Sequence, residues 1–209
     1  VGDAAAIGQM LRTAGFASVV TLSDPTLADL KRALADLSTA ARDADIAVAF
    51  YAGHGVETGS TAYLVPAGAT IAQRADLDAA ALPLDAIVAA TAPARRLGLV
   101  LFDASRSDPF AGSAARRPAT RVPASEPSTV PSGGNTLVGY ATGTRSDALE
   151  GTGAHSPFTA ALLAHLATPG LDIRLAFTRI RDAVLKATDR RQEPYLYGSL
   201  GGETVSLAP

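Results

Sequence analysis

The sequence predicts an α/β fold built on a largely parallel sheet. Short and almost continuous apolar runs, at residues 45–51 and 97–102, have the composition of strands that are covered on both faces. Segments with the apolar spacing of amphipathic helices separate such runs along the chain. Strands that alternate with helices favour parallel pairing, and ligands of such folds bind beyond the carboxyl ends of the strands. The residues that directly follow the two runs are therefore candidate site residues.

The other predicted elements continue this alternation. Apolar residues three and four positions apart indicate each helix, as in the leucines of residues 25–41, and Asp3 would cap the first helix. In chain order, we predict helices at residues 3–14, 25–41, 83–91, 157–167 and 171–188, and strands at residues 16–22, 45–51, 97–102, 136–141 and 204–207. Residues 107–135 are rich in Ser, Pro, Ala, Gly and Arg, which predicts a flexible loop.

Composition limits the class of protein. A length of 209 residues predicts a single domain that covers residues 1–209. A hydrophobic content of 47% is enough for a sizeable core. The 18 basic and 20 acidic side chains argue against a surface that binds nucleic acid, and no apolar run is long enough to span a membrane. The chain has no cysteine, which excludes disulfides, thiolate metal sites and a cysteine nucleophile in this sequence. A nucleotide-binding domain is disfavoured because no Gly-rich phosphate loop is present.

His54 is the first candidate catalytic residue. It lies between two glycines directly after the strand predicted at residues 45–51, and an imidazole can take up and return protons near neutral pH. The alternative is a turn histidine that only ends the strand. His155 and His165 are interpreted as structural residues. No second histidine has metal-ligand spacing from His54, so no metal site is predicted.

Ser105 is the candidate nucleophile, because it follows the other buried strand. Neighbouring strand ends of a parallel sheet can bring a histidine and a nucleophile together as a dyad. Asp103 shares the Ser105 side of the strand and could offer a carboxylate to a basic group of a substrate. The alternative for both residues is a turn or helix cap without catalytic function.

Several motifs along the chain, in the same order and spacing, resemble the bacterial caspase-like peptidases related to metacaspases and paracaspases, including orthocaspases. The matching segments are residues 50–55, 62–66, 99–106, 109–110, 141–147, 156–159 and 191–195. The resemblance covers nearly the whole chain and implies a caspase-like three-layer α/β/α sandwich with a mostly parallel sheet. It also implies a strand before the first helix, which is missing here, so we expect residues upstream of Val1 or a separate segment to fill that position.

The resemblance implies a catalytic dyad of His54 and the residue at position 105. In the family, the histidine acts as general base or acid and a cysteine attacks the peptide carbonyl, whereas this chain has Ser105. The backbone N–H groups of Gly55 and Ser105 would form the oxyanion hole. Three explanations of the serine stay open: an engineered Cys-to-Ser change, a natural pseudo-protease that binds peptides or a protein partner without cutting them, and a genuine serine nucleophile.

The resemblance also implies substrates with Arg or Lys before the scissile bond. The acidic residues of the pocket would correspond to Asp103 and Asp147, since carboxylates pair with a cationic side chain. Self-cleavage in the loop would use Arg116, Arg117 or Arg121. No cofactor or tightly bound metal is expected, with calcium dependence left open. Peptides or proteins are the expected partners, rather than nucleic acid or membrane, and a monomer is favoured. Such a soluble domain would be cytoplasmic or periplasmic.

Overall fold

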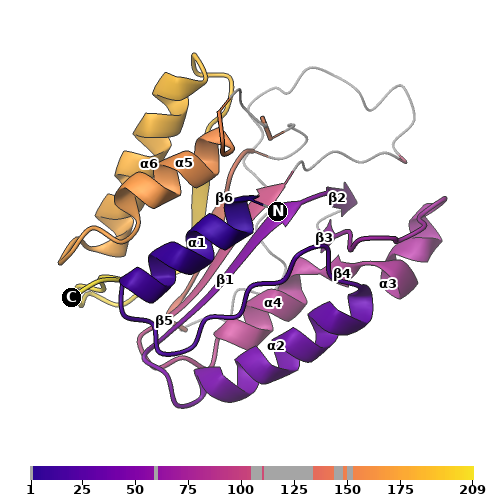
Figure 1. Ribbon diagram of the computed structural model, residues 1–209, viewed down its shortest axis with the longest axis horizontal. Coiled ribbons are helices and arrows are strands. Elements are labelled where there is room, and N and C mark those ends of the chain that lie inside the picture. Colours follow the sequence, from indigo (N-terminus) through magenta and orange to yellow (C-terminus); the bar gives the residue numbers. More distant parts are fainter. Residues whose placement is uncertain (1, 59–60, 105–109, 111–133, 144–147, 150–152) are drawn as a thin grey trace.

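The computed structural model describes residues 2–58, 61–104, 110, 134–143, 148–149 and 153–209, and its main sheet has four strands (Figure 1). The sheet order is β1-β5-β6-β7, formed by β1 (Ile46–Gly53), β5 (Leu97–Ala104), β6 (Thr136–Tyr140) and β7 (Tyr195–Ser199). The first two pairings are parallel and the last is antiparallel. The prediction of a mostly parallel sheet is therefore confirmed.

Helices cover both faces of this sheet (Figure 1). One face packs against α1 (Gly2–Thr13), α5 (Pro157–His165) and α6 (Ile173–Ala187), and the other against α2 (Leu27–Ala41) and α4 (Leu84–Thr91). The sequence of β5 is apolar throughout because both faces of the strand are buried. Leu99 and Leu101 point to the face covered by α1, α5 and α6, and Val100 and Phe102 point to the face covered by α2 and α4. No helix in the described ranges has the length and apolar character needed to cross a membrane.

A second, smaller sheet follows β1 directly, and the sequence analysis missed it. It contains β2 (Gly55–Thr58), β3 (Thr61–Leu64) and β4 (Leu82–Pro83), all antiparallel. A short 3-10 helix (Arg74–Asp76) and α3 (Leu77–Ala80) connect β3 with β4. Strands of two to four residues are too short to show a periodic pattern, so only their pairing identifies them.

Two predicted strands are wrong. Residues 16–22 form no strand, because they take part in none of the described strand pairings; Val20 is 75% exposed and Arg12 donates a hydrogen bond to the carbonyl oxygen of Val19. Residues 204–207 form no strand either, because Val205 bonds to the start of α6 through Ile173 N–H and the Asp172 carboxylate. The final strand is β7 instead, which pairs with β6.

The other predicted helices and strands are present, with ends shifted by a few residues. Helix α2 starts after Thr26, whose hydroxyl accepts the N–H of Asp29 in a capping box. The loop predicted at residues 107–135 lies almost entirely outside the described residues. Strand β1 is at one edge of the described sheet, and a further strand at a vacant position stays a prediction.

Candidate active site

His54 lies between β1 and β2, and its side chain is exposed. Its backbone is fixed, because its carbonyl oxygen accepts hydrogen bonds from the Tyr51 hydroxyl at 2.8 Å and from Val65 N–H at 3.0 Å. A Cβ at Gly53 would come within 2.7 Å of the Tyr51 hydroxyl oxygen, so a larger residue there would displace the hydroxyl that bonds to the His54 carbonyl oxygen. The turn therefore presents an imidazole to solvent on a rigid backbone.

The pairing register directs the N–H of Gly55 away from β3. Gly55 is opposite Leu64 in the antiparallel pair β2–β3, and the hydrogen bond from Val65 N–H to His54 flanks this position. Such an arrangement defines a non-hydrogen-bonded pair, in which the N–H and C=O groups point away from the partner strand. The Gly55 N–H is thus directed away from the ladder and can serve as a donor to a ligand.

Parallel pairing brings the ends of β1 and β5 to the same edge of the sheet. Gly53 is in register with Ala104, and in the sequence His54 and Ser105 follow these two residues. Ser105 itself lies outside the described residues, as do Asp147, Arg116, Arg117 and Arg121. The expected roles of these five residues stay predictions.

Asp103 is near the end of β5 and is only 6% exposed. One of its carboxylate oxygens, Oδ2, accepts hydrogen bonds from the Ser156 hydroxyl at 2.5 Å and the Thr159 hydroxyl at 3.0 Å. Burial is the main cause that raises the pKa of Asp103 to about 6; the hydrogen bonds from the Ser156 and Thr159 hydroxyls oppose this shift, and the nearby Asp3 adds to it. A carboxylate in this environment gains from a cation that binds next to it.

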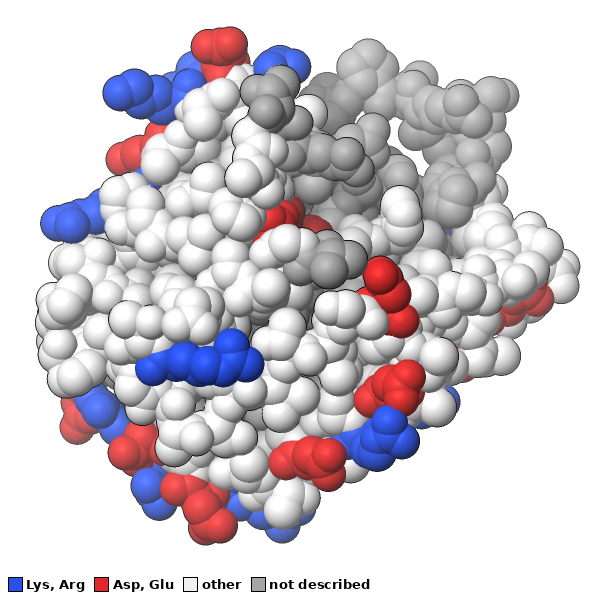
Figure 2. All heavy atoms as spheres, viewed as in Figure 1, with Lys and Arg blue, Asp and Glu red and all other residues white. Residues whose placement is uncertain are grey.

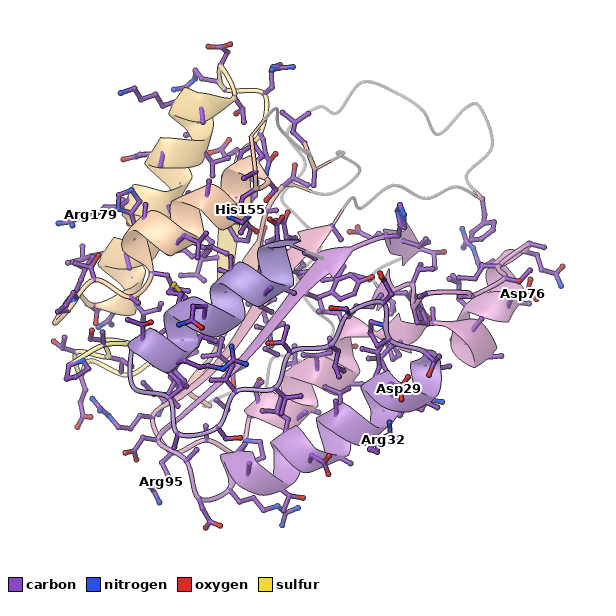
Figure 3. All side chains as sticks on the ribbon, viewed as in Figure 1. Asp29, Arg32, Asp76, Arg95, His155 and Arg179 are labelled. Atoms are coloured by element: carbon purple, nitrogen blue, oxygen red, sulfur yellow. The ribbon has the colours of Figure 1, made fainter. Side chains whose placement is uncertain are left out.

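Asp3 is a site residue that the sequence analysis missed. It was predicted to cap the first helix, but α1 already begins at Gly2. Its carboxylate reaches the start of α5 instead, where Oδ1 lies 2.7 Å from His155 Nδ1 and Oδ2 accepts Ser156 N–H at 3.3 Å. Figure 3 shows His155 beside the N-terminal end of α1. No local sequence signal could have identified a contact across 152 residues.

Ser156 joins the two acids. It is the N-cap of α5: its hydroxyl accepts Thr159 N–H and donates to Asp103, while its own N–H donates to Asp3. The positive end of the helix dipole therefore faces two carboxylates. Figure 2 shows acidic surface in a recess near the N-terminal end of α1. The sequence analysis included Ser156 only in the motif at residues 156–159 and predicted no role for it.

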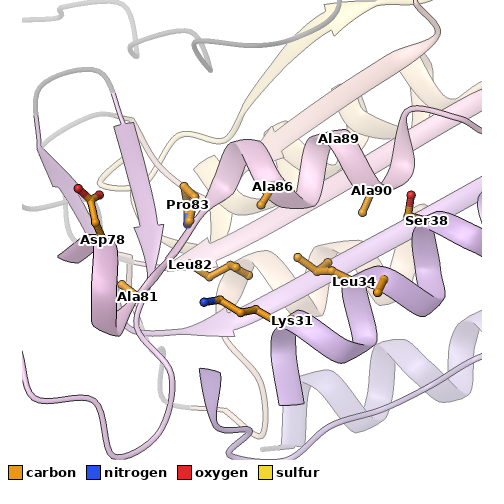
Figure 4. Close-up of a pocket in the computed structure, with 11 residues that line it drawn as sticks. Lys31, Leu34, Ser38, Asp78, Ala81, Leu82, Pro83, Ala86, Ala89 and Ala90 are labelled. Carbon is orange, nitrogen blue, oxygen red and sulfur yellow. The ribbon is translucent and has the colours of Figure 1, made fainter. Parts of the chain in front are cut away.

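A separate open groove of about 500 Å³ lies between α2 and α4 (Figure 4). It is mostly apolar, with Lys31, Ser38 and Asp78 as its polar side chains, and it contains none of the predicted site residues. In the described part of the chain, no three His, Asp or Glu side chains are placed to hold a metal ion.

The fold and the site together define a class: an α/β/α sandwich whose polar site lies at the carboxyl edge of a mostly parallel sheet. The caspase domain family model matches residues 1–204, and the chain belongs to this family. Caspase-domain proteins are cysteine peptidases that act on proteins or peptides.

Solved structures agree on the fold. The crystal structure of caspase-1 from Spodoptera frugiperda has a TM-score of 0.67 and 16% sequence identity, and covers 99% of this chain and 80% of that chain. At this identity the likeness establishes the caspase-like fold alone. A search of the curated proteins finds no match.

Proposed function

We propose that this caspase-family domain is built to hydrolyse peptide bonds that follow Arg or Lys. The observation that carries the proposal is the acidic pair of Asp3 and Asp103, two carboxylates that meet at Ser156 beside the carboxyl edge of the sheet. Two like charges close together in a buried site repel each other, and a bound guanidinium or ammonium group relieves that repulsion.

The hydrogen bonds of Asp103 leave one of its carboxylate oxygens available to such a cation. Both of its described donors bind Oδ2, and no Lys or Arg of the described residues forms an ion pair with it. Burial of a charged carboxylate without a cationic partner costs free energy. A ligand that brings a positive charge next to Asp103 recovers part of this cost, so the site favours basic ligands. The planar guanidinium of Arg suits a carboxylate acceptor best. From the resemblance, we also propose that Asp147 contributes to binding of the basic side chain.

The proposed reaction uses His54 and the side chain at position 105. With cysteine there, the thiolate sulfur attacks the carbonyl carbon, and the N–H groups of Gly55 and residue 105 hold the resulting oxyanion. His54 then protonates the leaving amine as the C–N bond breaks. Water, deprotonated by His54, attacks the thioester and releases the acid product and the free thiol. This route uses no cofactor.

Serine at position 105 makes this form inactive or weakly active. A thiol ionises near pKa 8.5 and histidine readily activates it further, whereas a serine hydroxyl is far harder to ionise. A site shaped for a cysteine therefore loses most of its nucleophilicity with Ser105. The second candidate function follows from the same residue: a pseudo-protease that binds peptides with a basic side chain, or a protein partner, and does not cleave them.

The test compares the Ser105 protein with the Ser105→Cys variant on short peptides with Arg, Lys, Asp or Ala before the scissile bond. We expect cleavage after Arg and Lys by the cysteine variant, and its loss in the double variant Ser105→Cys, His54→Ala. Binding of the Arg peptide by both proteins without turnover would favour the pseudo-protease. Failure of both to bind or cleave would contradict both candidates. Mass spectrometry of the cysteine variant would show whether it cuts itself after Arg116, Arg117 or Arg121.

A further inference from the structure

His155 forms a specific contact with the acidic pair. Its Nδ1 lies 2.7 Å from Oδ1 of Asp3, and Ser156 N–H donates to the other oxygen at 3.3 Å. Consecutive residues at the start of α5 therefore hold both oxygens of a carboxylate that belongs to α1. The two side chains are partly buried, with 29% of His155 and 19% of Asp3 exposed.

The contact has a defined direction. An ionised carboxylate only accepts hydrogen bonds, so the proton lies on Nδ1 of His155 and the imidazole donates to Asp3. Without this donor, the longer backbone contact from Ser156 is the one hydrogen bond that the described residues still give to the Asp3 carboxylate. Asp3 would then be free to adopt other rotamers and to turn away from Asp103.

We propose that His155 is a specificity-determining positioning residue, which donates from Nδ1 to Asp3 and holds that carboxylate where it can act together with Asp103 on a basic side chain. The inference rests on the proposed function, because it concerns the same acidic pair of Asp3 and Asp103. It assigns His155 no contact with the reacting atoms. Its effect is on charge selectivity, which a merely structural link between α1 and α5 would not change.

The experiment measures binding to the Ser105 protein by isothermal titration with two tetrapeptide amides. One ends in Arg and the other in citrulline, which has nearly the same shape without the charge. The variants are His155→Ala, His155→Asn and His155→Gln, with His165→Ala at the other end of α5 as the matched control. Thermal unfolding of each variant separates loss of fold from loss of selectivity.

We expect the parent protein to prefer the Arg peptide and His155→Ala to lose about tenfold of that preference, in line with loss of one charge-assisted hydrogen bond. The amide nitrogen of Asn can take the position of Nδ1, so His155→Asn should stay within about threefold of the parent. The Gln amide reaches further and should behave like Ala. His165→Ala should leave the preference unchanged. If His155→Ala does not fold, the contrast between Asn and Gln still tests the donor position.

Three results would overturn the inference while the proposed function stands. They are an unchanged preference in His155→Ala, an equal loss for both peptides, and equal behaviour of the Asn and Gln variants. If the parent protein binds the two peptides equally, or binds neither, His155 has no charge preference to set and this inference fails; the proposed function fails with it if the Ser105→Cys variant also leaves Arg and Lys peptides uncut.

Discussion

The hydroxyl of Tyr51 lies 2.8 Å from the carbonyl oxygen of His54 and 3.1 Å from that of Val65. Burial raises the pKa of Tyr51 to about 12, so the hydroxyl stays a neutral donor throughout the working range of a peptidase. The bond fixes the peptide plane between His54 and Gly55, and therefore also the direction of the Gly55 N–H.

Tyr51→Phe removes this donor and should loosen the proposed oxyanion hole. In the Ser105→Cys background, we expect kcat on Arg peptides to fall by about tenfold with KM nearly unchanged, since the contact acts on the transition state. The free energy of unfolding should fall by about 1 kcal/mol. Tyr63→Phe is the control, because its hydroxyl donates to Asp78 and not to the His54 turn. An unaltered kcat in Tyr51→Phe would contradict the positioning role.

Binding of Arg peptides should depend on the ionisation of Asp103. The pKa of its carboxyl is raised to about 6, so the negative charge is lost as the pH falls below that value. We expect the affinity of the Ser105 protein for an Arg peptide to rise as the pH passes about 6 and then to level off. Titration calorimetry between about pH 5 and 8 measures this. A flat profile, or one that persists in Asp103→Asn, would disprove the assignment.

The same carboxylate should reduce stability at neutral pH. Its folded-state pKa of about 6 exceeds the ordinary value of 3.8, so the folded protein binds the proton more tightly than the unfolded chain. The stabilisation is complete below pH 3.8 and is lost as the pH rises through about 6. Asp103→Asn should therefore raise the free energy of unfolding above pH 7 by roughly 1–3 kcal/mol, while it abolishes Arg preference.

Denaturant titration above pH 7 and near pH 4 checks this stability prediction, with Asp182→Asn as control. The side chain of Asp182 is 67% exposed beside Arg181, so its removal should change stability by less than about 0.5 kcal/mol. A lower stability of Asp103→Asn at both pH values would mean that the hydrogen bonds of Asp103 outweigh its burial cost.

Ser156→Ala should affect stability and charge together. It removes the N-cap of α5 and a donor to Asp103, which should cost about 2 kcal/mol. Because the bond from Ser156 lowers the pKa of Asp103, its loss should move the midpoint of Arg-peptide binding to higher pH. Ser156→Thr keeps the hydroxyl, so it should retain both the stability and the binding midpoint of the parent protein. A midpoint that stays in place in Ser156→Ala would show that the hydroxyl has no influence on the charge of Asp103.

The sequence predicted the main sheet because its signals are local. The apolar runs that became β1 and β5 need no distant information, since a strand covered on both faces must be apolar throughout. Parallel pairing of such strands then places their carboxyl ends at one edge. This is why His54 and position 105 could be proposed as neighbours from the sequence. The predicted strand at residues 16–22 was wrong because a strand also needs a paired neighbour.

The sequence by itself thus determined the family, the parallel sheet and the edge at which chemistry is expected. The sequence also proposed Asp103 as an acidic site residue, but only the tertiary structure showed that Asp3 joins it and which groups surround the two carboxylates. Asp3 contacts His155 across 152 residues, and Ser156 contacts Asp103 across 53. Such contacts exist because α1 and α5 pack side by side on one face of the sheet. The charge and the pKa of a buried carboxylate depend on the groups that packing brings to it, and no periodic pattern in the chain encodes them.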